Sequence, residues 1–320
     1  MSALFAILIW GAQLPIAKGV MGQLDGFTLT FIRYGVAVVL FVIILWWKEG
    51  KAAFRWEDQS KAILIGGGLG MGGSALLVFL GLSMTKPELA VIILALQPGM
   101  AALGHWVFFK RRPPYFTLLC LALAFCGVVI AVTRGGASFQ ALTGEGVGLS
   151  QHAGAIISTG SARLDQLIGE LLVLVGAMAW VTYVLASSKL AHWSALRIAT
   201  VNCIPAVVVI GIAWATAMAF GYKRWPSVDL WTGWLGFKVA YVALLGVFLA
   251  MMLWNEGARK IGPLNAMLLL NLMPLITFAF RALEGARFDA SELLGAAVVV
   301  SALVANNVYQ RLKRRPVRNP

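Results

Sequence analysis

The sequence has few charged residues for its length, and this shortage excludes an ordinary water-soluble chain. Only 12% of its 320 residues are charged, whereas 60% are hydrophobic, and the mean hydropathy is +0.84. Soluble domains normally carry about 25% charged residues. The net charge of +13 lies in short clusters between apolar runs, which is typical of membrane topology signals and unlike a nucleic-acid-binding face. The composition predicts an integral membrane protein whose partner is the lipid bilayer.

Cysteine and histidine are also scarce. Cys120, Cys126 and Cys203 lie inside apolar runs without the spacing of a disulfide or zinc site. The three histidines are scattered, and neither an HExxH nor a GxSxG motif is present, so a membrane-embedded enzyme is disfavoured. We expect no catalytic residues, no metal and no other cofactor.

Acidic residues are missing from the middle of every apolar run. Proton-driven carriers usually place a carboxylate or a histidine along the transport path. We therefore expect transport down a substrate gradient or in exchange for a counter-substrate. Glu88, Glu170, Glu256 and Glu284, at the ends of runs, are the residues that would contradict this expectation if they lay deeper.

Apolar runs long enough to cross a bilayer occur ten times. They cover approximately 3–20, 27–47, 62–84, 88–109, 115–133, 170–188, 196–219, 233–255, 264–283 and 290–308. The Gly/Ser-rich interval 134–169 is interpreted as an extracytoplasmic linker, and 309–320 as a basic cytoplasmic tail. Most of the 26 Lys and Arg residues face the cytoplasm if the N-terminus does, which places both termini there.

One stretch of the chain occurs twice. Residues 81–98 read GLSMTKPELAVIILALQP, and residues 257–274, GARKIGPLNAMLLLNLMP, align with them without a gap at an offset of 176 residues. Six of the eighteen positions are identical, whereas chance would give about one. Each copy predicts the end of a helix, a tight connection, and a second helix with a proline near its middle. The chain is therefore a duplicated unit.

The number of spans in each half predicts their relative orientation. Because five is odd, the half at 170–308 would cross the membrane in the direction opposite to the half at 1–133. Inverted repeats are typical of secondary transporters, whose binding site lies between the repeats near mid-membrane. We predict an all-α membrane protein of ten transmembrane helices in two inverted-topology five-helix repeats.

Candidate substrate-binding residues follow from their depth in the spans. Side-chain amides are costly in lipid, so Gln13, Gln97 and Asn271 must face protein or a wet cavity, where ligand contact and interhelical hydrogen bonds are both open. Trp10 and Trp180 occupy matching places in the repeats, where they either wall a cavity or pack helices. The remaining candidates are Ser74, Tyr183 and Tyr241.

Arg33 and two prolines complete the set. An arginine inside a span needs a partner, which is either a substrate carboxylate or the side chain of Asp25 or Glu170. Pro98 and Pro274 each remove a backbone hydrogen bond and would kink their helices, for structural reasons or to let each repeat bend.

Several short motifs, in order, resemble the drug/metabolite transporter superfamily and its ten-helix EamA-type members. They are IWGAQLPIAK with Trp10, FIRYGVA with Arg33, the paired LALQP and LNLMP, and LEGARF with Glu284. The family often has an acidic residue at the end of helix 4, where this chain has Phe108 and Phe109. The resemblance implies export or exchange of small metabolites, often amino acids, through a cavity lined by helices 1, 3, 4, 6, 8 and 9. Amines, drugs and nucleosides are the alternative substrates.

Overall fold

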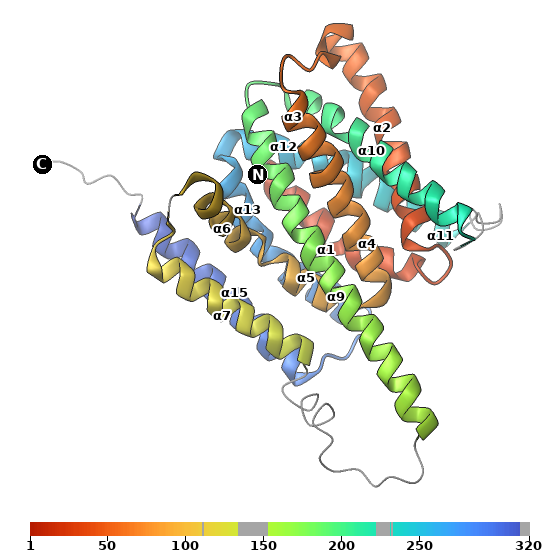
Figure 1. Ribbon diagram of the computed structural model, residues 1–320, viewed down its shortest axis with the longest axis vertical. Coiled ribbons are helices and arrows are strands. Elements are labelled where there is room, and N and C mark those ends of the chain that lie inside the picture. The colour runs from red at the N-terminus through yellow and green to blue at the C-terminus, as the bar shows by residue number, and fades with distance from the viewer. Residues whose placement is uncertain (111, 134–152, 222–230, 232, 314–320) are drawn as a thin grey trace, which may run out of the picture.

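The computed structural model describes residues 1–110, 112–133, 153–221, 231 and 233–313, and these residues form helices and connections without a strand (Figure 1). The helices follow the predicted spans in order. The first half contains α1 (Ser2–Val20), α2 (Gly26–Glu49), η1 (Lys51–Phe54), α3 (Ser60–Ile63), η2 (Leu64–Gly73), α4 (Ser74–Met84), α5 (Pro87–Leu94), α6 (Gln97–Phe109) and α7 (Tyr115–Thr133). The second contains α9 (Ala153–Ser187), η4 (Ser188–Leu190), α10 (Ala195–Ala219), α11 (Trp234–Ala240), η6 (Tyr241–Leu249), α12 (Ala250–Ile261), α13 (Pro263–Leu268), η7 (Leu269–Leu272), α14 (Met273–Leu283) and α15 (Ala290–Lys313).

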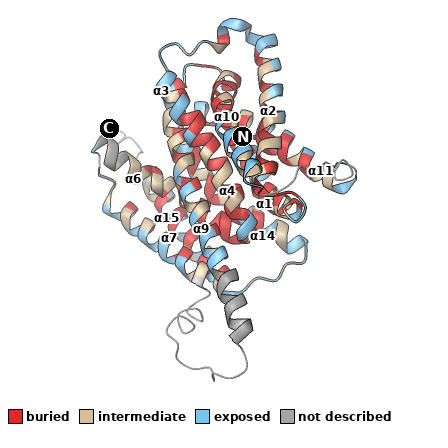
Figure 2. Ribbon diagram, turned by 45° about the vertical axis from the view of Figure 1, so that its right-hand side comes forward, coloured by how far each residue is buried: buried red, intermediate tan, exposed pale blue. Residues whose placement is uncertain are grey.

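Most of these helices are membrane-spanning by length and composition. Within the described residues, nine continuous helical segments are long and apolar enough to cross a bilayer, and the apolar part of α15, Ala290–Asn306, is a shorter tenth. Exposed residues, many of them large and apolar, lie along the outside of the bundle, and buried residues lie in its centre (Figure 2). The predicted all-α, multi-pass membrane fold is confirmed. The inverted orientation of the halves and the cytoplasmic termini stay predictions.

The boundary of the central linker differs from the expected one. α9 begins at Ala153, so residues 153–169, expected as linker, are helical, and α9 extends beyond the bundle (Figure 1). This stretch is too polar for lipid, but a helix satisfies its own backbone hydrogen bonds and can continue into water. Residues 134–152 of the expected linker lie outside the described residues. α15 ends at Lys313, and 314–320 of the expected tail also lie outside them.

The sequence repeat is visible as matching irregularities of the helices. The third span of each half contains a π-helical stretch, η2 in the first half and η6 in the second. The following span is interrupted in each half, between α5 and α6 and at η7, respectively. Stretches of π-helix cost regular hydrogen bonding and are frequent at functional sites. Their recurrence shows that the duplication preserves backbone detail as well as sequence.

The glycine-rich run in η2 packs directly against the second half. A Cβ on Gly67 would lie 2.5 Å from the Asn202 carbonyl oxygen, and one on Gly70 would lie 2.6 Å from the Tyr183 backbone nitrogen. This run is therefore a helix-packing surface. α7 and α15 pair with each other at one edge of the bundle (Figure 1), where Gly127 and Gly295 allow their backbones to approach closely.

Candidate functional site

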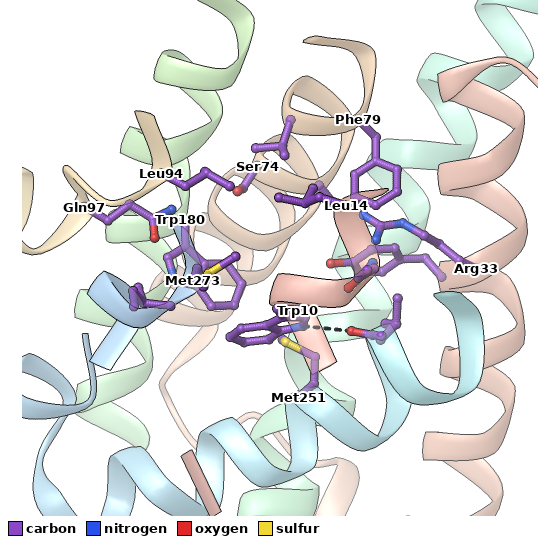
Figure 3. Close-up of a pocket in the computed structure, with 17 residues that line it drawn as sticks. Trp10, Leu14, Arg33, Ser74, Phe79, Leu94, Gln97, Trp180, Met251 and Met273 are labelled. Atoms are coloured by element: carbon purple, nitrogen blue, oxygen red, sulfur yellow. Dashed lines mark hydrogen bonds between the residues drawn. The ribbon is translucent and has the colours of Figure 1, made fainter. Parts of the chain in front are cut away.

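A cavity of about 100 Å³ lies between the two halves of the chain, at the level of the helix irregularities (Figure 3). Its lining comes from α1, α2, α4, α5 and α6 of the first half and from α9, η6, α12, η7 and α14 of the second. Both halves therefore build one site. The lining residues are Trp10, Gln13, Leu14, Arg33, Tyr34, Ser74, Ala75, Val78, Phe79, Leu94, Gln97, Trp180, Gly246, Val247, Met251, Leu270 and Met273.

Many lining residues occupy corresponding positions of the repeat. Trp10 matches Trp180 near the middle of the first span of each half. Four such pairs contribute both members to the cavity wall: Trp10 and Trp180, Ala75 and Met251, Leu94 and Leu270, and Gln97 and Met273. The wall thus has an approximate two-fold relationship in sequence position.

Aromatic side chains form the floor of this cavity. The rings of Trp10 and Trp180 meet edge to face, with centroids 5.3 Å apart and an interplanar angle of 88°. Trp254 supports both rings from behind, at 5.4 Å from Trp10 and 5.9 Å from Trp180, and is itself buried. The Trp10 indole Nε1 donates a hydrogen bond of 2.8 Å to the Gly246 carbonyl oxygen in η6 (Figure 3). The indole therefore has a fixed orientation and presents an apolar surface to a ligand.

Amide and hydroxyl groups line the cavity from the first half. Gln13, Ser74 and Gln97 are all buried and all line it. Gln97 opens α6, directly after the break that follows α5. Figure 3 shows Gln97 and Arg33 at opposite ends of the drawn residues, with Trp180 and Trp10 between them. The site can therefore offer polar groups at two ends of an apolar body.

Arg33 is the charged residue of the lining. Its side chain is only 4% exposed, and its guanidinium carbon lies 3.4 Å from the Phe79 ring centroid and 5.1 Å from that of Tyr34. Nε has no hydrogen-bond partner among the described residues. A cation–π contact contributes about 0.5–2 kcal/mol, whereas an uncompensated buried charge costs several kcal/mol. The aromatic rings alone do not offset the burial of this charge.

The two protein partners considered for Arg33 are engaged elsewhere. Asp25 caps α2, where its carboxylate accepts hydrogen bonds from the backbone of Phe27 and Thr28. Glu170 accepts hydrogen bonds from Thr85 and Gln166. The predicted pairing of Arg33 with either carboxylate is therefore wrong for this conformation. Asp25 is bound by the first turn of its own helix, and Glu170 is bound by neighbouring side chains.

Three expected ligand contacts do not line the cavity. Tyr183 is fully buried and donates a 2.8 Å hydrogen bond to Asn255 Oδ1. Tyr241 donates its hydroxyl to the Ile9 carbonyl oxygen at 3.2 Å, which ties η6 to α1. Asn271, in η7, is buried, and neither side-chain polar atom has a partner among the described residues. In this conformation Tyr183 and Tyr241 bind other helices instead of facing the cavity.

The prolines lie at the starts of helices that follow the interruptions of the spans. Pro98 lies in the first turn of α6 and Pro274 in the first turn of α14, where a missing amide proton costs little. The Leu270 carbonyl, expected to be free, accepts a hydrogen bond from the Met273 amide in the 3₁₀ turn. Both prolines therefore lie directly after an interruption of the span, and the expected kinks stay predictions.

The acidic residues at the span ends form ion pairs or hydrogen bonds away from the cavity. Glu88, which is 3% exposed, pairs with Arg281 at 2.7 Å, and Arg281 also binds Glu284. Glu256 pairs with Lys260 at the end of α12. None of the described acidic residues lines the cavity.

Sequence reasoning missed the residues that surround Arg33 and the methionines of the second half. Phe79 and Tyr34 carry no polarity signal at mid-span, and Met251 and Met273 look like ordinary lipid-facing or core residues. The repeat contained the missing signal, because Met273 lies at the position that matches Gln97.

The sequence pattern of the EamA-like transporter family matches residues 1–133 and 167–308, which include every cavity-lining residue. The chain belongs to this family. The resemblance to the drug/metabolite transporter superfamily is therefore confirmed. Together with the apolar helices, it makes the chain an integral, multi-pass membrane transporter, and the plasma membrane is the usual location of the family.

Two proteins similar to this chain are named as transporters. The uncharacterized transporter YrdR of Bacillus subtilis strain 168 is 28% identical over 314 residues, which cover 97% of this chain and 91% of YrdR. The uncharacterized transporter YyaM of the same organism is 24% identical over 304 residues, which cover 94% of this chain and 90% of YyaM. A crystal structure with 19% identity superposes with a TM-score of 0.64 over 98% of both chains, which shows the fold alone.

Proposed function

We propose that this family member is a secondary transporter that exports or exchanges small amphipathic organic metabolites, amino acids among them, by alternating access. The observation that carries the proposal is the cavity between the repeats, lined by matched residues of both. The binding residues are Trp10, Gln13, Ser74, Gln97 and Trp180, with Arg33 as the charge anchor and Tyr183, Tyr241 and Asn271 in reach of the cavity when the helices move.

The broken spans supply the moving parts. η2, η6, η7 and the α5–α6 break lie at or beside the cavity, so each can absorb a backbone change next to the ligand. Pro98 and Pro274 stand at the start of the segments that would swing. An interrupted helix at the binding site is the arrangement that secondary transporters use for alternating access.

Coupling to the substrate's own gradient, or to a counter-substrate, fits this lining. The cavity presents no Asp, Glu or His among its residues, and its arginine stays protonated. An imposed pH step across proteoliposomes that hold equal substrate inside and outside should therefore produce no accumulation. Accumulation abolished by an uncoupler would contradict this, and Glu88 and Glu170, both buried, would then be the residues to substitute.

An enzyme is the alternative from another class. Among the described residues, no group of three or more His, Cys, Asp and Glu is arranged to hold a metal ion. A drug, amine or nucleoside exporter of the same fold is the nearer alternative. It would show flux of those compounds and none of amphipathic metabolites in the same vesicles.

Substitution of the matched tryptophans tests the site itself. Trp10→Ala and Trp180→Ala should each weaken substrate affinity several-fold, because aromatic contact contributes about 0.5–1.5 kcal/mol beyond area burial. Trp193→Ala is the control, since Trp193 is buried and packs against Ile63 and Leu190 outside the cavity. Flux into proteoliposomes is the measurement. Unchanged affinity in both cavity variants would assign the tryptophans to helix packing.

A further inference from the structure

We propose, on the basis of the transport function above, that the cavity selects monocarboxylates with an apolar body. In this arrangement Arg33 binds the carboxylate, and an ammonium group on the ligand is not required. Zwitterionic amino acids and simple organic acids of the same shape then bind alike, whereas amines without a carboxylate are excluded.

Arg33 is a buried cation whose Nε has no hydrogen-bond partner among the described residues. Its guanidinium stacks on Phe79 at 3.4 Å, which occupies one face of its plane and leaves the N–H donors directed outward at its edge. The side chain is 96% buried, its Nε lacks a partner, and it belongs to the cavity wall. A guanidinium edge matches a carboxylate with two parallel hydrogen bonds. The unpartnered Nε lies on a guanidinium edge whose shape matches a planar anion.

Among the described residues, the cavity lining has one positive charge and no negative charge. Arg33 is the single ionised group of the lining, and no described acidic residue lies within ion-pair distance of it. One bound carboxylate brings the site to net zero, whereas a phosphate monoester would leave excess negative charge in an apolar enclosure. A cationic amine would add a second unpaired positive charge. The balance therefore favours a ligand that brings one carboxylate to Arg33.

The remaining lining defines the rest of the ligand. Trp10, Trp180, Met251 and Met273 present apolar surface to the cavity, and Figure 3 shows them between Arg33 and Gln97. No carboxylate is present to bind an ammonium, whose partners would be ring faces and neutral amides. Loss of the ammonium from a ligand should therefore change its affinity little.

Two matched sets of compounds test this selectivity. With a phenyl body they are 3-phenylpropanoate, phenylalanine and phenethylamine; with an isobutyl body they are 4-methylpentanoate, leucine and isopentylamine. Binding to the full-length protein in detergent is followed by tryptophan fluorescence, because Trp10 and Trp180 line the site. We expect both carboxylate-bearing members of at least one set to bind within about threefold of each other, and the amine at least tenfold more weakly. Amine binding as tight as carboxylate binding, or no carboxylate binding in either set, would overturn the proposal.

Variants of Arg33 give an independent measurement. Arg33→Gln should lower carboxylate affinity at least tenfold, and Arg33→Lys, which keeps the charge without the fork, should lower it less. Lys238→Gln removes a partly buried positive charge from another span outside the cavity and should leave affinity unchanged. Because Arg33 is buried without a partner, ligand-free Arg33→Gln should melt at the same or a higher temperature than the parent, and carboxylate should no longer raise its Tm. A lower Tm without ligand would identify Arg33 as a structural residue.

Flux measurements separate this proposal from the transport function. Arg33-dependent carboxylate binding without flux in proteoliposomes would leave the selectivity intact and remove the transporter assignment for these compounds. Flux of amines that is insensitive to Arg33→Gln would keep the transporter and remove the selectivity.

Discussion

The two halves of the chain share a backbone plan but contribute different chemistry to the cavity. Irregular helices recur at matching positions, and four residue pairs face the cavity together. The polar members, however, come from the first half: Gln13, Arg33, Ser74 and Gln97. At the matching positions Ser74 is replaced by Ala250 and Gln97 by Met273.

The comparison shows that the wall has matching positions in both halves, while its polar side chains come from one half. A wall that is symmetric in position but polar on one side orients an amphipathic ligand, because only one orientation satisfies both the charged end and the apolar body. The second half then contributes mainly apolar surface to the cavity.

The largest expected effect is a loss of stability when an ion pair is broken. The residues at the matching positions of the repeat do not form such a pair. Glu88 and Arg281 correspond by the repeat to Leu264 and His105. Arg281→Gln would leave the carboxylate of Glu88 buried and should reduce the free energy of unfolding by about 3 kcal/mol, measured by thermal melting in detergent. Adding Glu88→Gln should restore most of this loss. A single variant as stable as the parent would show that this end of the bundle does not depend on the pair.

Matched glycines give the next effect. A Cβ on Gly70 would meet the backbone of Tyr183 at 2.6 Å, whereas one on Gly246 would meet the side chain of Gln13 at 2.6 Å. Gly70→Ala should therefore cost about 2 kcal/mol of stability through overpacking, because a backbone cannot move aside. Gly246→Ala should lower the melting temperature less and instead weaken ligand binding by displacing Gln13. Equal loss of stability in both would contradict the difference between the halves.

Exchange of side chains across the repeat should have a smaller effect. Gln97→Met makes the cavity apolar at both matched positions and should weaken binding about fivefold, equivalent to roughly 1 kcal/mol for one hydrogen bond. Met273→Gln, which adds an amide opposite, serves as the comparison and should not reproduce the loss. Ligand titration of the two variants and of the double variant would show whether binding requires the amide on the side of the first half.

The smallest expected effect is a pH dependence at a contact between the halves. Arg197 and Trp193 both donate hydrogen bonds to Glu57, and the bond from Arg197 holds the pKa of this carboxyl below its ordinary value. Because the pKa of Glu57 is lower in the folded chain, the contact stabilises the fold at a pH above the ordinary pKa of a glutamate. This stabilisation is lost as the pH falls through the pKa of Glu57 in the folded chain. Melting temperatures between about pH 5 and pH 3 should fall slightly more for the parent than for Glu57→Gln. Parallel curves would show that the contact contributes nothing.

The sequence by itself determined the membrane class, the order of the spans and the duplication. Hydrophobicity along a run decides whether a helix enters a bilayer, and this property is local. It also placed Trp10, Gln13, Arg33, Ser74, Gln97 and Trp180 at cavity depth, where the structure brings them together.

Only the tertiary structure decided which mid-span residues face the cavity. Depth follows from position along the chain, but direction depends on the rotation of each helix about its axis, which changes by about 100° per residue and is set by packing against neighbours. Gln13 and Tyr241 are both expected near mid-span, yet only Gln13 lines the cavity, because Tyr241 is bound to the Ile9 carbonyl. The stacking of Arg33 on Phe79 joins two helices, and no pattern within either helix encodes it.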